Sequence, residues 1–328
     1  MRRHWVLALL ASVLISAAIP VWLGGGVGLL DALDRFPPWG LLPLIAMVTA
    51  GWVCNAFRLR LLAGAFGLRL PLRETFAKVL SIEFAGTATP AYTGGPATSV
   101  LLFTRRGLGV PEAGALVVLD QITDFAFFAT FLPLAALLVL GDVPLQYVLV
   151  AGLGAPAGFA LLLWLPRHYR PLALWLGRIF RRLPVLHRYR WRLGRALIRF
   201  RAAVRLMLGL GRWRLAALYG FCAAHWLLRY GIVPVIFLLL GDPQPWAWLF
   251  ITQAVSLFIG HLSLLPGGSG GVEVGFGMML SAWVDAPVLA AALLVWRFCT
   301  FHWYLIAGAP AFLFTVGRGG PVARQPAD

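Results

Sequence analysis

The chain has 328 residues, of which 60% are hydrophobic, and its 28 basic and 12 acidic residues give a formal net charge of +16. Soluble domains are about 45–50% apolar, so the composition excludes a soluble protein and the nucleic-acid partner that this charge would otherwise suggest. Several apolar runs reach the roughly 20 residues that a bilayer-crossing helix needs. We therefore predict an all-α polytopic membrane protein that binds no nucleic acid.

Apolar stretches predict about seven to eight transmembrane helices in a single membrane domain. The predicted spans are residues 5–24, 39–62, 115–140, 146–165, 214–240, 246–264 and 288–315. Two further apolar segments, 80–103 and 266–284, are interrupted by Gly and Pro. We expect an N-terminal half of about 1–165, a basic segment of about 166–213, a C-terminal half of about 214–316 and a short tail, 317–328.

Basic residues orient the chain, because Lys and Arg concentrate in cytoplasmic loops. They precede the first predicted span and follow the second, where we count Arg58 with the loop arginines. The opposite loops carry aspartates such as Asp242 and Asp285. We therefore expect both termini to be cytoplasmic, in the inner (plasma) membrane of a bacterium.

The two interrupted segments should lie differently in the membrane. Segment 80–103 has basic residues on both flanks, so we expect a re-entrant hairpin that starts and ends on the cytoplasmic side. Segment 266–284 should make the remaining crossing, from a cytoplasmic start at Pro266 to Asp285 outside. Irregular backbone at membrane depth is tolerated where it lines a cavity or is buried in protein.

The segment 166–213 holds most of a run of fourteen arginines, from Arg167 to Arg214, without any acidic residue. Arginines recur there every three to four residues, which predicts one or two amphipathic helices on the cytoplasmic face. Two interpretations stay open. The segment recruits anionic lipid, or it is a solvated loop that only fixes the topology.

Ionisable residues at membrane depth are costly and are candidates for function. Glu273 and Arg297 are each alone in an apolar segment, so we expect them to pair across neighbouring helices. Such a pair is either a structural salt bridge or a contact for a charged headgroup. Glu83 is the corresponding lone carboxylate of the N-terminal half.

Asp120 and Asp124 are spaced i, i+4 and share one helix face, where they repel each other unless a cation lies near. Arg229 is one candidate partner for them, because it and Arg297 are the only arginines deep in a C-terminal span. The alternatives are that one aspartate is protonated, as a proton-coupled step would require, or that Asp120 lies in water at the membrane boundary.

Two Gly-rich breaks complete the candidate site. TPAYTGGP (89–96) includes Pro90, Gly94 and Gly95, and LPGGSGG (265–271) includes Pro266, Gly267, Gly268 and Gly270. Paired interruptions in two halves are typical of transporter binding sites, and helix N-termini at such breaks can hold an anion. The alternative is a pair of unrelated kinks.

Catalytic and metal-binding patterns such as GxSxG, HxxxH or a P-loop are absent from the sequence. The three cysteines fall in apolar runs without metal-ligand spacing and are expected to be buried. We therefore predict no enzymatic activity, no cofactor and no metal.

The chain resembles the transmembrane domain of lysylphosphatidylglycerol synthetases and their stand-alone, flippase-like relatives. LPGGSGGVE (265–273) and the arginine of LLVWRFCTFHWYLIAGAP (293–310) carry the resemblance, and residues 87–124 agree more loosely. The resemblance implies two inverted or pseudo-symmetric halves around a lipid-accessible cavity and movement of a polar lipid between leaflets. It also implies that Pro266, Gly267, Gly268, Gly270, Glu273, Arg297 and Asp124 are site residues.

Two departures from the family pattern stand in the N-terminal half. The break has Tyr92, Gly94, Gly95 and Pro96 in place of the family's arginine and Gly-Glu. The helix that follows has Gln121 in place of an arginine. The resemblance therefore leaves open a less charged or differently charged lipid.

The function that we expect is a lipid translocator or lipid-binding transporter for a polar or isoprenoid lipid, without the aminoacyl-transferase domain of bifunctional relatives. The partner is a membrane lipid, either one with an anionic headgroup or an isoprenoid lipid, and lipid-biosynthesis proteins are candidate partners. The alternatives are a non-transporting scaffold for lipid biosynthesis and a membrane-embedded lipid-modifying enzyme.

Overall fold

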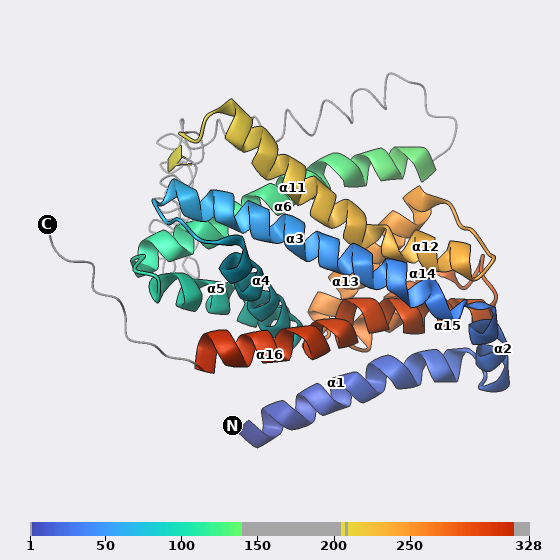
Figure 1. Ribbon diagram of the computed structural model, residues 1–328. Helices are drawn as coiled ribbons and strands as arrows, with labels where there is room; N and C mark the ends of the chain where they lie inside the picture. Colours follow the sequence, from blue (N-terminus) through green and yellow to red (C-terminus); the bar gives the residue numbers. More distant parts are fainter. Residues whose placement is uncertain (1, 140–204, 207–208, 318–328) are drawn as a thin grey trace, which may run out of the picture.

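The computed structural model describes residues 2–139, 205–206 and 209–317, and all regular elements in these ranges are helical (Figure 1). The prediction of an all-α polytopic protein is confirmed. The predicted span 146–165 and nearly all of the basic segment 166–213 lie outside the described residues. The helices are α1 (Arg2–Leu23), α2 (Val27–Arg35), α3 (Leu41–Ala65), α4 (Leu72–Thr87), α5 (Gly94–Thr104), α6 (Val110–Val139), α11 (Arg212–Tyr230), α12 (Ile232–Leu239), α13 (Trp246–Leu262), α14 (Gly271–Leu280), α15 (Ala286–Arg297) and α16 (Trp303–Gly317).

Five helical stretches in the described ranges are long and apolar enough to cross a membrane. They match predicted spans closely: Val6–Leu23, Pro38–Ala65, Val110–Val139, Arg212–Leu239 and Ala286–Gly317. The last of these joins α15 to α16 through a π-helical turn, Phe298–His302. It is the most enclosed of the five, with 67% of its apolar window buried, whereas α1 is 17% buried and lies at the edge of the bundle (Figure 1).

Helices α3 and α11 form an antiparallel pair (Figure 1). Phe57 stacks on Phe221 with ring centroids 5.2 Å apart, and His225 Nδ1 donates a hydrogen bond of 3.0 Å to the Gly51 carbonyl. Gly40, before α3, lies against Leu239 at the end of α12. The start of α3 and the end of α12 are therefore at the same end of the molecule.

Helices α4 and α5 form a short hairpin that begins where α3 ends. Gly94, the first residue of α5, lies so close to α4 that an added Cβ would be 2.3 Å from the Ala85 carbonyl oxygen. On its outer side α4 packs on α16, where Gly308 faces the backbone of Leu80. At 16 and 11 residues, the two arms are about 24 and 16 Å long at 1.5 Å per residue, which is too short to cross a bilayer.

A second hairpin, α13 and α14, begins at the opposite end of the molecule, where α12 ends and α15 starts. The two helices touch through glycines: a Cβ on Gly271 would lie 2.9 Å from the Ile259 carbonyl oxygen, and one on Gly275 would lie 3.0 Å from the Ser256 Cα. The arms have 17 and 10 residues, almost the same lengths as α4 and α5.

The tips of the two hairpins meet inside the bundle. Pro90 and Pro266 form an isolated antiparallel β-bridge, and Glu83, near the tip of α4, contacts Asn55 in the middle of α3. The two hairpins approach this point from opposite ends (α4 and α5 from the left, α13 and α14 from the right in Figure 1).

This arrangement corrects two sequence-based predictions. Residues 246–264 do not run the full length of the bundle, and 266–284 does not start at an end of the bundle. Instead α13 stops at Leu262 and the chain folds back, so that Pro266 lies at the level of the middle of α3. The physical reason is the glycine content of α14, which lets it pack along α13 as a hairpin.

Candidate functional site

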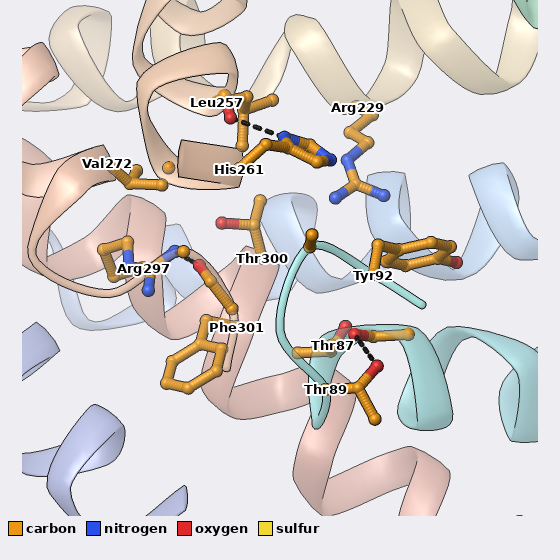
Figure 2. Close-up of a pocket in the computed structure, with 15 residues that line it drawn as sticks. Thr87, Thr89, Tyr92, Arg229, Leu257, His261, Val272, Arg297, Thr300 and Phe301 are labelled. Carbon is orange, nitrogen blue, oxygen red and sulfur yellow. Dashed lines mark hydrogen bonds between the residues drawn. The ribbon is translucent and has the colours of Figure 1, made fainter. Parts of the chain in front are cut away.

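A small cavity of about 80 Å³ lies where the two hairpin tips meet (Figure 2). It lies between residues from both Gly-rich breaks and from α11, α13 and the π turn. The described residues that line it include two arginines, a histidine and three threonines but no carboxylate: Arg229, Arg297, His261, Thr87, Thr89 and Thr300. The two breaks thus lie together. A shared binding site requires this proximity, whereas two unrelated kinks would have no reason to meet.

Glu273 and Arg297 form the predicted ion pair. Arg297 Nε lies 2.7 Å from Glu273 Oε1, and both side chains are almost fully buried. Arg297 also donates hydrogen bonds of 3.1 Å to the Gly267 carbonyl and to Ser269 Oγ. Since all three guanidinium nitrogens contact the protein, this pair holds the C-terminal break in shape.

The C-terminal break needs glycine for two separate reasons. Gly267, Gly268 and Gly270 have φ of +63°, +66° and +83°, a region that side chains rarely adopt. A Cβ on Gly267 would also lie 2.2 Å from the ring of Phe301. The Gly270 N–H, at the start of α14, donates a 2.7 Å hydrogen bond to Glu273 Oε2, so the helix N-terminus is capped from within.

The N-terminal break is built around Tyr92. Its ring lies between Gly86 and Gly95, where a Cβ would come within 2.1 and 2.6 Å of ring atoms. Ala91 and Tyr92 have φ of +50° and +59° although neither is glycine, which marks a strained turn of the kind found at functional sites. The Gly94 N–H donates to Thr89 Oγ1 at 2.7 Å, so this helix start is also capped by the protein.

Glu83 is not alone, contrary to its appearance in the sequence. It accepts hydrogen bonds from the Tyr92 hydroxyl at 2.9 Å and from Asn55 Nδ2 at 3.3 Å. Arg229 Nη1 lies 3.8 Å from Glu83 Oε2, the oxygen that Tyr92 also contacts. Asn55 Nδ2 in turn lies 3.3 Å from Nε2 of His225. A buried polar network therefore runs from α3 and α11 to the tip of the first hairpin.

Asp120 and Asp124 pair with Arg58, not with Arg229. Arg58 Nη2 lies 2.7 Å from Asp120 Oδ1 and its Nη1 lies 2.5 Å from Asp124 Oδ1. Trp226 Nε1 donates to the same Asp124 oxygen at 2.7 Å. The prediction that Arg229 neutralises the aspartates is thus wrong, and so is the placement of Arg58 in a loop, because Arg58 is 4% exposed within α3.

Comparison with known proteins identifies the family of this chain. The family model described as "Lysylphosphatidylglycerol synthase TM region" matches residues 9–308. The chain belongs to this family. It is also 24% identical over 293 residues to a "UPF0104 membrane protein" of Archaeoglobus fulgidus, a match that covers 84% of this chain and 86% of that protein.

As a member of the lysylphosphatidylglycerol synthase transmembrane family, the chain departs from the pattern at Gln121. That side chain is exposed, so the aspartates take their guanidinium from α3 and do not depend on position 121. Residues that sequence reasoning missed are Asn55 and Arg58. Their signal was present: Asn55 and Arg58 are spaced i, i+3 on one face of an apolar helix.

Proposed function

We propose that this protein is a lipid translocator, or a lipid-binding transporter, that holds a polar headgroup in the cavity between the hairpin tips. The observation that carries the proposal is the meeting of two oppositely directed hairpins at Pro90 and Pro266 beside a cavity with polar and cationic lining. Irregular backbone at membrane depth is tolerated where it lines such a cavity or is buried in protein, and interrupted helices that meet at the midplane are typical of transporters.

The membrane arrangement that we propose combines this geometry with the charges that flank the hairpins. The α4–α5 hairpin starts from the cytoplasmic side and the α13–α14 hairpin from the outside, with both termini in the cytoplasm of the inner (plasma) membrane. Basic residues flank the first hairpin and the aspartates Asp242 and Asp285 flank the second, in agreement with the positive-inside rule. The proposed activity moves lipid without changing it chemically, so the protein is not an enzyme.

The proposal is tested by the lipids that remain bound through gentle purification. Ala91 and Thr93 are exposed residues of the same turn, but Ala91 lines the cavity and Thr93 does not. Ala91→Trp should fill the cavity, and Thr93→Trp adds the same side chain outside it. Mass spectrometry should find one lipid class enriched over the bulk membrane in wild type and in Thr93→Trp, and lost from Ala91→Trp.

Bulk lipid in bulk proportions in all three proteins would contradict the proposal. In that case the hairpins have only a structural role, and a non-transporting scaffold for lipid biosynthesis becomes the better explanation of the function. Conversion of the enriched lipid into a new species by the purified protein would instead reveal an enzyme.

A further inference from the structure

The two arginines that line the cavity differ in what occupies their nitrogens. Arg297 is 2% exposed and directs its nitrogens to Glu273, Gly267 and Ser269. Arg229 has one ion-pair contact, to Glu83 at 3.8 Å, and no hydrogen bond from its guanidinium to any residue in the described part of the chain. Of these two arginines, Arg229 is therefore the one with donors that are free to bind a ligand.

The surroundings of Arg229 hold its guanidinium at the cavity. The group lies 5.0 Å from the ring centroid of Tyr304 and 5.6 Å from that of Trp226, and cation–π contacts of this kind fix a cation without using its N–H donors. Figure 2 shows the guanidinium extending from α11 toward the space between His261 and Tyr92.

Other polar groups line the same cavity. His261 Nδ1 donates to the Leu257 carbonyl at 2.6 Å, so Nε2 of the neutral ring is an acceptor, which suits the hydroxyl of a phosphate monoester. The Thr87 hydroxyl, also in the lining, has no hydrogen-bond partner among the residues that the structure describes. A guanidinium and a hydroxyl, without a carboxylate in the described lining, provide donors for an oxyanion.

From this arrangement, and building on the proposed function, we propose that the cavity binds the phosphate group of an anionic lipid through Arg229. Glu83 is the counter-ion of Arg229 while the cavity is empty, and the phosphate replaces it. Glu83 then keeps its hydrogen bonds to Tyr92 and Asn55. The 3.8 Å separation makes Glu83 a weak competitor, because charge-assisted hydrogen bonds form at about 2.7–2.9 Å.

The test compares three probes on purified protein in detergent: dioctanoyl phosphatidic acid, dioctanoylglycerol and inorganic phosphate. The first two have the same acyl chains and differ by the phosphate. Binding can be followed by tryptophan fluorescence, since Trp226 lies against Arg229. We expect the phosphate-bearing lipid to bind about tenfold to a hundredfold more tightly than dioctanoylglycerol, as charge-assisted hydrogen bonds predict.

The two variants of the ion pair should change phosphatidic acid binding in opposite directions. Arg229→Gln should lose the preference for phosphate, whereas Glu83→Gln should strengthen phosphatidic acid binding because it removes the competing charge. Arg212→Gln removes the same charge from an exposed position on the same helix and should bind like wild type. Size-exclusion profiles and melting temperatures establish that each variant is folded.

Several outcomes would overturn the inference. Equal binding of both dioctanoyl lipids by wild type would exclude the phosphate while leaving the lipid cavity intact, and so would an Arg229→Gln variant with unchanged preference. Inorganic phosphate that binds as tightly as phosphatidic acid would exclude a lipid source for the anion. Absence of any co-purified lipid class would instead contradict the proposed function itself.

Discussion

Arg58 is the residue whose loss should do most damage to the fold. It neutralises two carboxylates inside the bundle, and removing one partner of a buried pair costs about 3–5 kcal/mol. Arg58→Met should therefore lower the melting temperature of the solubilised protein more than Asp124→Asn. Asp124→Asn should in turn cost more than Asp120→Asn, because Asp124 also accepts the Trp226 hydrogen bond. An Asp120→Asn variant less stable than Arg58→Met would contradict this order.

Glu273 and Arg297 should behave as a coupled pair. Arg297→Met leaves a carboxylate buried without its counter-ion, at a cost of about 3–5 kcal/mol. The double variant Glu273→Gln/Arg297→Met removes both charges, and the amide oxygen of the introduced glutamine can still accept the Gly270 N–H. We expect the double variant to melt at a higher temperature than Arg297→Met alone. Additive losses in a double-mutant cycle would show that the two side chains do not stabilise each other.

At the residue scale, the sequence predicts partners only where the choice is small. Glu273 and Arg297 were each alone in an apolar segment, so their pairing followed. Arg58 stood near other arginines at the end of a span, and its i, i+3 spacing with Asn55 was too weak a signal to distinguish a buried guanidinium from a loop residue. Arg229 was paired with the wrong acids because the spacing of residues along the chain does not show which helices are neighbours. In the structure α3 lies beside both α6 and α11, so Arg58 of α3 reaches the aspartates of α6.

At the scale of elements, the hairpins depend on glycines that face a helix backbone. A Cβ on Gly271 would lie 2.9 Å from the Ile259 carbonyl oxygen, whereas one on Gly220, an exposed glycine in α11, meets nothing within 4 Å. Gly271→Ala should therefore separate α14 from α13 and lower the melting temperature. Gly220→Ala is the matched control and should be neutral or stabilising by about 0.5–1 kcal/mol. Equal melting temperatures for the two variants would refute the close packing.

The sequence located nearly every described helix but not how α13 and α14 are arranged. Hydropathy detects only how long an apolar run is, and the run 246–264 is long enough to be taken for a transmembrane span. What makes it one arm of a hairpin is tertiary packing, through Gly260, Gly271 and Gly275. The breaks were recognisable from their Gly and Pro content, whereas their contact at Pro90 and Pro266 required the structure.

For the whole molecule, the opposed hairpins and the membrane orientation that we propose predict a labelling pattern. In a version without Cys54, Cys222 and Cys299, a membrane-impermeant maleimide should label Asp242→Cys from outside and Thr104→Cys from the cytoplasm. Ser263→Cys, at the tip of α13, should react slowly from the cytoplasmic side. If it instead labels there as fast as Thr104→Cys, residues 246–264 cross the whole membrane and the hairpin is excluded.

The most direct test of the central claim uses a cross-link between the hairpin tips. An antiparallel bridge places Cα atoms about 4.5–5.5 Å apart, within disulfide range, so Pro90→Cys/Pro266→Cys should cross-link on oxidation. The protein is reconstituted in phosphatidylethanolamine and phosphatidylglycerol vesicles with a trace of tail-labelled phosphatidylglycerol, and dithionite reports lipid movement between leaflets. We expect transport to require separation of the tips, so the reduced protein should move the label, the oxidised protein should not, and reductant should restore movement. Equal movement in both states would contradict the account.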